Sequence, residues 1–419
     1  MSSDHDESRQ PAKAEVQAAL GVRGAQKAGI DIGVARSADG GLDFLHQHGA
    51  ILVRDPYLER VREVVGGGRS LDGLINGVTL YSLDDAEIPG TVAALEAIDE
   101  QLGVGVATPN HVLSICPVHT CPANEPEEVP ADAAPDPGVC PGDHGSGVYI
   151  HVIDTGLLDD ASAHPWLAGV TGEQDPLPDP PPGGVRQIPD HTYSGHGTFV
   201  AGVARCMAPL SEVHVVRDFN VAGILLESEV VKRLDDALNL GSDVINFSAG
   251  GTSRNDLPLL GFEAFWERYR LYKGVVLVAA AGNNGDRRPF WPAAFPHVVS
   301  VGALAADLRS RASFSGHGGW VDVYARGEAL VNAYATGSYI CREPPHVGEQ
   351  RQFHGMARWG GTSFATSLVS GLVAARMSRT GENGPQAADA LLGLARAQAL
   401  PGVGAVLWSC GTDATGAHS

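Results

Sequence analysis

The sequence lacks several features of membrane and nucleic-acid-binding proteins. No apolar run approaches the ~20 residues that a membrane-spanning helix needs. Basic residues are scarce, since 29 Lys and Arg face 49 Asp and Glu, which leaves a formal charge of −20 at pH 7. An acidic surface repels phosphate groups. We therefore expect no nucleic-acid partner and no membrane association.

A secretory signal is also missing. The first residues read MSSDHDESRQPAKAEVQ, and they contain no basic segment followed by an apolar one. The expected location is therefore the cytoplasm. Secretion stays open as the alternative, through a misassigned start or an unconventional export route.

Cysteine is sparse and follows no metal-binding pattern. The chain has six: Cys116, Cys121, Cys140, Cys206, Cys341 and Cys410. An even count is compatible with disulfides, but the spacing fixes neither their pairing nor the redox compartment. Zinc sites use paired C-x-x-C spacing or histidines at fixed steps, and His119 and His144 supply no such pattern. We predict no metal and no other cofactor.

The composition is that of a globular protein with many loops. Hydrophobic residues make up 43% and charged residues 19%, which is enough for a substantial core. Glycine (53) and proline (27) are frequent. The length of 419 residues favours about two or three domains.

The N-terminal part of the chain contains two kinds of sequence. Residues 1–45 are polar without a stable apolar period, which predicts a disordered leader. Residues 46–115 mix strand-like and helix-like patterns and so predict a small α+β domain. Strands are expected at 50–53, 78–83 and 111–115, and helices at 56–65 and 91–102.

The remainder of the chain predicts a linker and a second domain. Pro and acidic residues dominate 116–146, as in a linker or exposed loop. Residues 147–410 show apolar runs at 148–153, 213–216, 244–247, 275–280 and 298–301, with the clearest helix at 229–240. Continuous apolar runs are typical of strands that are buried on both faces of a parallel sheet. Because helical segments lie between some of these runs, we predict a doubly wound, mostly parallel α/β sheet. Residues 411–419 are expected to be a flexible tail.

Three reactive side chains occupy positions that an α/β sheet would expose. Asp154 follows an apolar run, His196 stands between two glycines, and Ser363 precedes an apolar helical pattern. Each alone has an ordinary structural explanation as a loop aspartate, a core histidine or an N-cap serine. Together they supply the carboxylate, base and nucleophile that peptide hydrolysis needs.

Four blocks around these residues resemble one protease family. VIDTGL, GHGTFVAG and GGTSFAT contain Asp154, His196 and Ser363, and AAGNNG contains Asn283. In this order they resemble the signature blocks of the subtilisin-like serine proteases (subtilases, peptidase family S8). The resemblance implies that Ser363 attacks the scissile carbonyl, His196 moves the proton and Asp154 holds the imidazole. Asn283 and the backbone N–H of Ser363 would bind the oxyanion.

The resemblance also implies a strand that pairs with the substrate. It lies in the segment at 244–250, for which a plain core strand is the alternative. The expected substrate-binding residues are Asn246, Ser248, Ala249, Gly250, Ala281 and Gly282.

The chain departs from the family pattern in three places. Ser367 stands where the family usually has Pro, which should alter the first turns of that helix. A polar insertion at roughly 336–358, which includes Cys341, is expected to form a rim loop that narrows substrate choice. The family's calcium loops are not recognisable, so no calcium is predicted.

Residues 48–115 resemble the ferredoxin-like propeptide of this family. The resemblance implies an intramolecular inhibitor, with residues 108–115 as the tail in the substrate cleft. Self-cleavage would then fall near Ile115 or Cys116, but Pro117 follows directly, and proline after the scissile bond is usually resisted. Either the cut lies elsewhere in the linker or the domain stays attached.

The sequence thus favours a monomeric serine endopeptidase, made as a zymogen, that acts through an acyl-enzyme. Limited processing of a precursor peptide or protein is the preferred role, with general protein degradation as the alternative. Two other classes stay open: a catalytically silent binding protein on the same fold, and an esterase or amidase. The sequence does not define the side-chain preference or the oligomeric state.

Overall fold

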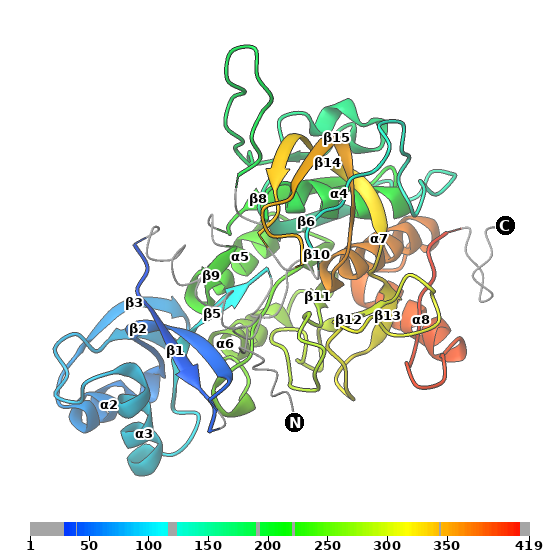
Figure 1. Cartoon of the computed structure of the whole chain (residues 1–419). Helices are drawn as coiled ribbons and strands as arrows, with labels where there is room; N and C mark the ends of the chain where they lie inside the picture. The colour runs from blue at the N-terminus through cyan, green and yellow to red at the C-terminus, as the bar shows by residue number, and fades with distance from the viewer. Residues whose placement is uncertain are drawn as a thin grey trace, which may run out of the picture.

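The computed structural model describes residues 29–38, 40–115, 124–189, 193–219, 223–342 and 345–410. The expected leader up to residue 28 and the expected tail at 411–419 lie outside these ranges. Figure 1 shows a smaller unit, drawn in blue and cyan, against one side of a larger body. We call residues 29–115 the N-terminal unit and residues 124–410 the main body.

The N-terminal unit has a β-α-β-β-α-β order. Its elements are β2 (Leu42–Arg54), α2 (Leu58–Val65), β3 (Arg69–Ile75), β4 (Val78–Ser82), α3 (Thr91–Leu102) and β5 (Ala107–Ser114), with the short helix η1 (Asp55–Tyr57) before α2. The strands pair in the order β3-β4-β2-β5, all antiparallel. Side chains alternate between the two faces of a strand. Ile51 and Val53 of β2 therefore face α2 and α3, while Leu52 faces the main body.

The predicted leader is wrong over its last residues, because β1 (Ile32–Arg36) and the start of β2 form an antiparallel pair there. The local pattern was weak for a physical reason. Ile32 is the buried residue of β1, and it packs on Val112, Ile224 and Leu226 from distant parts of the chain. The order of this segment depends on those partners and not on its own periodicity.

The main body is built on a seven-stranded parallel sheet with the order β13-β12-β11-β10-β6-β8-β7. The strands are β6 (Tyr149–Asp154), β7 (Thr171–Gly172), β8 (Glu212–Arg217), β10 (Val244–Phe247), β11 (Val276–Ala280), β12 (Val299–Leu304) and β13 (Val323–Arg326). The helices are α4 (His196–Met207), α5 (Glu227–Asn239), α6 (Leu260–Tyr269), α7 (Thr362–Thr380) and α8 (Gly384–Ala397), with short turns η2 (Ala161–Ala163), η3 (Pro165–Leu167) and η4 (Arg254–Asp256). The predicted doubly wound α/β fold is confirmed.

Helices cover both faces of this sheet. Val152 packs in the same cluster as residues of α4, α7 and α8, whereas its neighbour Ile153 packs with residues of α5 and α6. Both faces are buried, which is why the strands read as unbroken apolar runs. No helix in the described part of the chain is both long and apolar enough to span a membrane.

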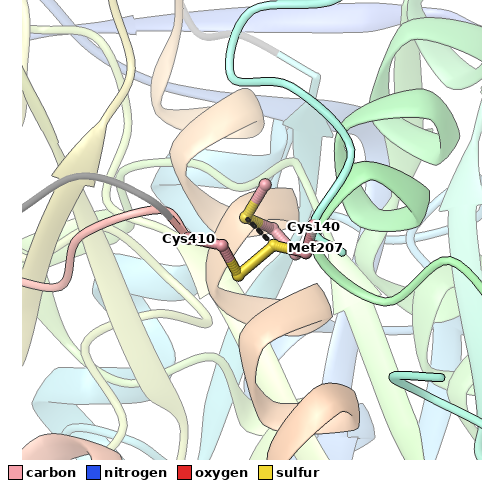
Figure 2. The surroundings of a disulfide bond; sticks show 3 residues. All are labelled: Cys140, Met207 and Cys410. Carbon is pink, nitrogen blue, oxygen red and sulfur yellow. Dashed lines mark hydrogen bonds between the residues drawn. A yellow bond between two sulfur atoms is a disulfide. The ribbon is translucent and has the colours of Figure 1, made fainter. Parts of the chain in front are cut away.

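Residues 124–140 form a loop, as one of the two predicted alternatives has it, but not a free linker, because this loop packs on the rest of the main body. Asp136 forms a bridge with Val331 and accepts two hydrogen bonds from Arg326, at 2.7 and 2.8 Å. Cys140 forms a disulfide with Cys410 beside Met207 (Figure 2). Acidic residues that suggested an exposed loop pair instead with cations of the main body. Residues 116–123 lie outside the described ranges.

The predicted rim loop at 336–358 is instead an antiparallel hairpin. Its strands are β14 (Leu330–Ile340) and β15 (Gln350–Trp359), drawn in yellow and orange above α4 in Figure 1. Polar side chains alternate with buried ones such as Phe353 and Met356 along β15. This alternation gives the segment its polar composition while the hairpin base packs into the core.

Candidate active site

Asp154 is the last residue of β6, in the middle of the parallel sheet. Its side chain is fully buried, and its Oδ1 accepts hydrogen bonds from the backbone N–H of Thr155 (2.8 Å) and from Nδ1 of His196 (2.7 Å). A buried carboxylate needs such donors, since isolated charge is strongly disfavoured in the interior. The two donors orient the carboxylate toward the imidazole.

His196 is the first residue of α4. The helix follows Gly195, whose φ of +79° suits glycine, and the ring of Tyr334 packs against this residue. The imidazole is fully buried, and the rings of Trp359 (centroid distance 5.8 Å) and Phe364 (5.3 Å) pack against it. These contacts restrict the orientation of the imidazole ring.

Asp175 ties the loops of Asp154 and His196 together. Its Oδ2 accepts hydrogen bonds from the backbone N–H of Gly195 (2.7 Å) and from Thr155 Oγ1 (3.3 Å). Burial raises the pKa of the Asp175 carboxyl to about 6. Sequence reasoning missed this residue, because it belongs to no motif and its partners lie twenty residues further along or back.

Ser363 lies in the first turn of α7, which packs closely on α4. The hydroxyl of Ser367 donates to the carbonyl of Val200, and a Cβ on Gly371 would lie 2.6 Å from the carbonyl oxygen of Ala204. Close helix packing therefore sets the position of Ser363 relative to His196. The helix runs unbroken through Ser367, the position where proline was expected.

The hydrogen bond between His196 and Ser363 is not formed in this structure. Ser363 Oγ donates instead to the carbonyl of Ser248 (3.2 Å), and within the described residues His196 Nε2 has no hydrogen-bond partner. The ring of Phe364, the next residue after Ser363, contacts the imidazole. The structure thus brings the three predicted residues to the same edge of the sheet. The hydrogen bond between Asp154 and His196 is formed, and the one between His196 and Ser363 is not.

Asn283 follows β11 and faces the start of α7. Its Oδ1 accepts hydrogen bonds from the backbone N–H and the hydroxyl of Thr362, both at 2.9 Å. This fixes the amide so that Nδ2 is its donor end. The first N–H groups of a helix have no partner within the helix, and that of Ser363 is one of them. The hydrogen bonds to Thr362 thus hold Asn283 against the first turn of α7, where Ser363 lies.

The predicted substrate strand holds part of the chain itself. Ser114 and Gly250 exchange two backbone hydrogen bonds, each 2.9 Å long. On the other side, β5 pairs antiparallel with β9 (Ile224–Leu226), and Ile115 donates to the carbonyl of Gly223 at 3.0 Å. We call the space between residues 223–226 and 248–250 the cleft. Residues 112–115 fill it as a central strand.

The other predicted binding residues lie close to the cleft, with one exception. Ala281 and Gly282 directly precede Asn283, and Ala249 is buried beside Gly250. Asn246 does not reach the cleft, because its fully buried amide donates to Ser248 Oγ and accepts from Ser370 Oγ of α7, each at 2.9 Å. It therefore supports Ser248 from beneath.

Polar contacts also fix the N-terminal unit at the cleft. His111 Nδ1 donates to Glu227 Oε2 at 2.8 Å, with both side chains buried, and His111 Nε2 accepts from the backbone N–H of Arg254. Asp99 of α3 accepts from the Arg254 guanidinium at 2.6 Å. These interactions join β5 and α3 to the start of α5 and to η4.

No group of three or more His, Cys, Asp or Glu side chains that could hold a metal ion lies in the part of the chain that the structure describes. Cys206 and Cys341 are buried thiols, and burial raises the pKa of both. Cys116 and Cys121 lie outside the described residues. The expectation of no metal and no calcium stays a prediction.

Several known proteins resemble the main body of this chain. A family model described as the subtilase family matches residues 145–400. A thermophilic serine proteinase from Bacillus sp. (strain AK1) is 33% identical over 57% of this chain and 54% of its own length. Thermitase from Thermoactinomyces vulgaris is 31% identical over 54% of this chain and 74% of its own length. The match thus spans about half the length of the first of these relatives.

A solved structure shares the fold over a larger part of the chain. Fervidolysin from Fervidobacterium pennivorans, described as a keratinolytic enzyme related to subtilisin, aligns with a TM-score of 0.54. The alignment covers 85% of this chain and 58% of that one, at 20% identity. At this identity the likeness concerns the fold alone.

Proposed function

Because this chain belongs to the subtilase family, we propose that it is a serine endopeptidase with Asp154, His196 and Ser363 as its catalytic triad. The observation that carries the proposal is the 2.7 Å hydrogen bond between two fully buried side chains, His196 and Asp154, at the carboxyl end of the central sheet. Ligands of open α/β sheets bind at this end of the strands.

Asp154 prepares the imidazole to act as a base. Its carboxylate accepts the Nδ1 hydrogen bond, which keeps the proton on Nδ1 and leaves the lone pair on Nε2. To donate to Nε2, the Ser363 hydroxyl has to leave the carbonyl of Ser248. Hydrogen bonds in active sites are often open in the absence of substrate and close when it binds.

The chemical step then follows from the positions of these groups. Ser363 Oγ forms a bond to the scissile carbonyl carbon as its proton moves to His196 Nε2. The carbonyl electron pair moves onto the oxygen, where Asn283 Nδ2 and the Ser363 backbone N–H donate to it. The tetrahedral intermediate collapses, the C–N bond breaks, and the amine leaves with the proton from His196. Water then hydrolyses the acyl-enzyme by the same steps.

The N-terminal unit acts as an inhibitor in the uncut chain. Residues 112–115 hold the hydrogen-bonding positions that a substrate strand would need, including those of Gly250. Ile115 is the last described residue before the gap, so self-cleavage near Ile115 or Cys116 stays a prediction. Whether Pro117 prevents that cut decides between a removable propeptide and a permanent inhibitor.

Mass spectrometry of the purified wild type beside Ser363→Ala tests the proposal. The wild type should release the N-terminal unit by a cut between residues 115 and 124, or stay whole and cleave peptides only slowly. The Ser363→Ala protein should stay whole and inactive. Equal cleavage in both proteins would remove Ser363 from the mechanism.

Limited processing is the proposed role. A cleft that its own chain fills keeps the enzyme from acting until that segment is displaced, which suits a protease that must not degrade its surroundings. Incubation with a proteome extract, followed by mapping of the new termini, should give a few related sites. Many unrelated sites would instead indicate general degradation.

One observation favours a second candidate, a silent binding protein. Ser363 Oγ donates to Ser248, and His196 has an open Nε2 among the described residues. A protein that kept this arrangement would bind peptides in the cleft without cutting them. Labelling of Ser363 by a fluorophosphonate separates the two candidates, because the label needs an activated hydroxyl.

A further inference from the structure

Phe290 occupies an unusual place next to the cleft. Its side chain is only 2% exposed, yet its ring lies against backbone. A Cβ added to Gly250 would lie 2.5 Å from Phe290 Cε1, and one added to Gly282 would lie 2.9 Å from Phe290 Cγ. The ring is therefore inserted between the segment that pairs with the cleft strand and the segment that leads to Asn283.

The backbone around Phe290 holds the ring in this position. Its neighbour Trp291 exchanges two hydrogen bonds with Gly251, each 2.9 Å long. The carbonyl of Phe290 accepts from the N–H of Ala294 at 2.8 Å. The backbone next to Phe290 is thus paired to the segment whose inner side the ring contacts, and this pairing fixes the position of the Phe290 backbone at the cleft.

The space that the ring fills lies beside the reacting serine. β10 and β11 are parallel neighbours, with Phe247 opposite Ala279, so the segments that follow them leave the sheet side by side. Gly250 pairs with Ser114 in an antiparallel arrangement. In such a pair, a step of two residues forward along one strand is a step of two residues back along the other. A substrate strand bound in the same register would therefore place the residue two positions after the one at Ser114 opposite Ser248. Ser248 in turn accepts the hydrogen bond from Ser363 Oγ. A side chain at that position of a substrate would enter between the two segments.

We propose that Phe290 sets the size limit for the substrate residue that precedes the scissile bond. The inference rests on the proposed function and adds a substrate class to it. Gly, Ala, Ser and Cys fit beside the ring, whereas Leu, Phe and Tyr would have to displace it. Close-packed sites tolerate added volume poorly, since the neighbours must shift to accept it. The enzyme is therefore selective for small residues at this position.

Paired peptide substrates test the size limit in the full-length protein. They carry the same sequence and a chromogenic amide, and they differ only in Ala or Phe before that amide. The wild type should cleave the Ala substrate with a kcat/KM about 100-fold above that of the Phe substrate, the range that steric discrimination in a pocket reaches. The variant Phe290→Ala should lose this preference or reverse it.

A graded series and a matched control protect the test from misfolding. Phe290→Leu should give an intermediate preference, and Phe295→Leu, an aromatic truncation in the neighbouring core, should keep that of the wild type. A fluorophosphonate that labels Ser363 in each variant shows that the site is intact. Unchanged preference in labelled Phe290 variants, or a wild type that accepts Phe as readily as Ala, would overturn the size limit and leave the protease assignment standing. A wild type that neither labels nor cleaves either peptide once its N-terminal unit is displaced or removed would overturn both.

Discussion

The two largest sheets in the described residues bury their faces in different ways. Helices from the main body cover both faces of its parallel sheet. The antiparallel sheet of the N-terminal unit is covered by α2 and α3 on one face only. On the other face, Leu52 and Val78 pack in the same cluster as residues of α5 and α6. The N-terminal unit therefore depends on the main body to cover the second face of its sheet.

This difference in burial makes the main body a stable scaffold and the N-terminal unit a part that can be released. A sheet with one uncovered apolar face is marginal on its own. The contact that completes it also places residues 112–115 in the cleft. Docking and inhibition are therefore two results of the same packing. The four predictions below challenge this division, beginning with the largest effect.

Ser363→Ala should abolish catalysis without separating the two regions. Loss of the nucleophile of such a triad lowers kcat by about 10⁶-fold. The N-terminal unit should also stay attached, because the cut that frees it needs the same serine. Peptide hydrolysis and the intact mass report both effects. A variant that keeps even a hundredth of the wild-type rate would place the chemistry elsewhere.

Asn283→Ala should lower the catalytic rate of the main body and leave the attachment of the N-terminal unit unchanged. The amide oxygen of Asn283 is held by Thr362 at the start of α7, so Nδ2 is the donor end of this amide. Removing one such oxyanion donor lowers kcat by about 10²–10³-fold and changes KM little. Steady-state kinetics measure this, with Asn284→Ala as the control at the adjacent position. Equal losses in the two variants would mean that the effect is structural.

His111→Ala should loosen the N-terminal unit and spare the main body. The variant leaves Glu227 buried without its imidazole partner, which costs about 3 kcal/mol for a buried pair. Hydrogen exchange in the Ser363→Ala background should show the loss at β5 amides and not at β11 amides. Glu263→Gln removes an exposed ion pair with Arg54 across the same contact, and its effect should stay below about 1 kcal/mol. Equal losses at β5 and β11 would show that the two regions unfold as one.

Asp175→Asn should stabilise the main body in a pH-dependent way. Burial raises the pKa of Asp175 from 3.8 to about 6, so the folded state binds this proton more tightly than the unfolded chain does. The penalty for the charged form is therefore fully present above pH 6 and disappears as the pH falls to about 4. Asparagine keeps an oxygen acceptor for Gly195 and removes the charge.

Urea denaturation of both proteins measures this effect. The variant should be more stable by about 3 kcal/mol at pH 8 and nearly equal to the wild type at pH 4. Burial also raises the pKa of Asp218 to about 6, but this residue is the same in both proteins and cancels in the difference. A variant that is less stable at pH 8 would show that the Asp175 charge holds the loops together.

The sequence predicted those parts of the fold that carry a local signal. The apolar runs at β6, β10 and β11 were recognisable because both faces of each strand are buried. The positions of Asp154, His196 and Ser363 could be predicted because each stands at the end of an element in a glycine-rich motif. Local patterns of this kind do not depend on what the rest of the chain does.

The parts that sequence reasoning missed depend on distant partners. β1 forms a strand because it pairs with β2. β14 and β15 form strands because they pair with each other and pack on the core. Asp175 acquires its role from Gly195 and Thr155, and Phe290 from two glycines in separate segments. No local period marks such residues, since their environment exists only after the chain has folded.

The central claim is that the hydroxyl at residue 363 is activated by the buried pair at 196 and 154. Labelling by a fluorophosphonate probe tests it most directly, with the modified peptide identified by mass spectrometry. The account predicts that wild-type protein labels at Ser363 once the N-terminal unit is displaced or removed, and that His196→Ala and Asp154→Asn label far more slowly. A folded wild type with an open cleft that shows no label at Ser363, or a His196→Ala variant that labels as fast as the wild type, would contradict it.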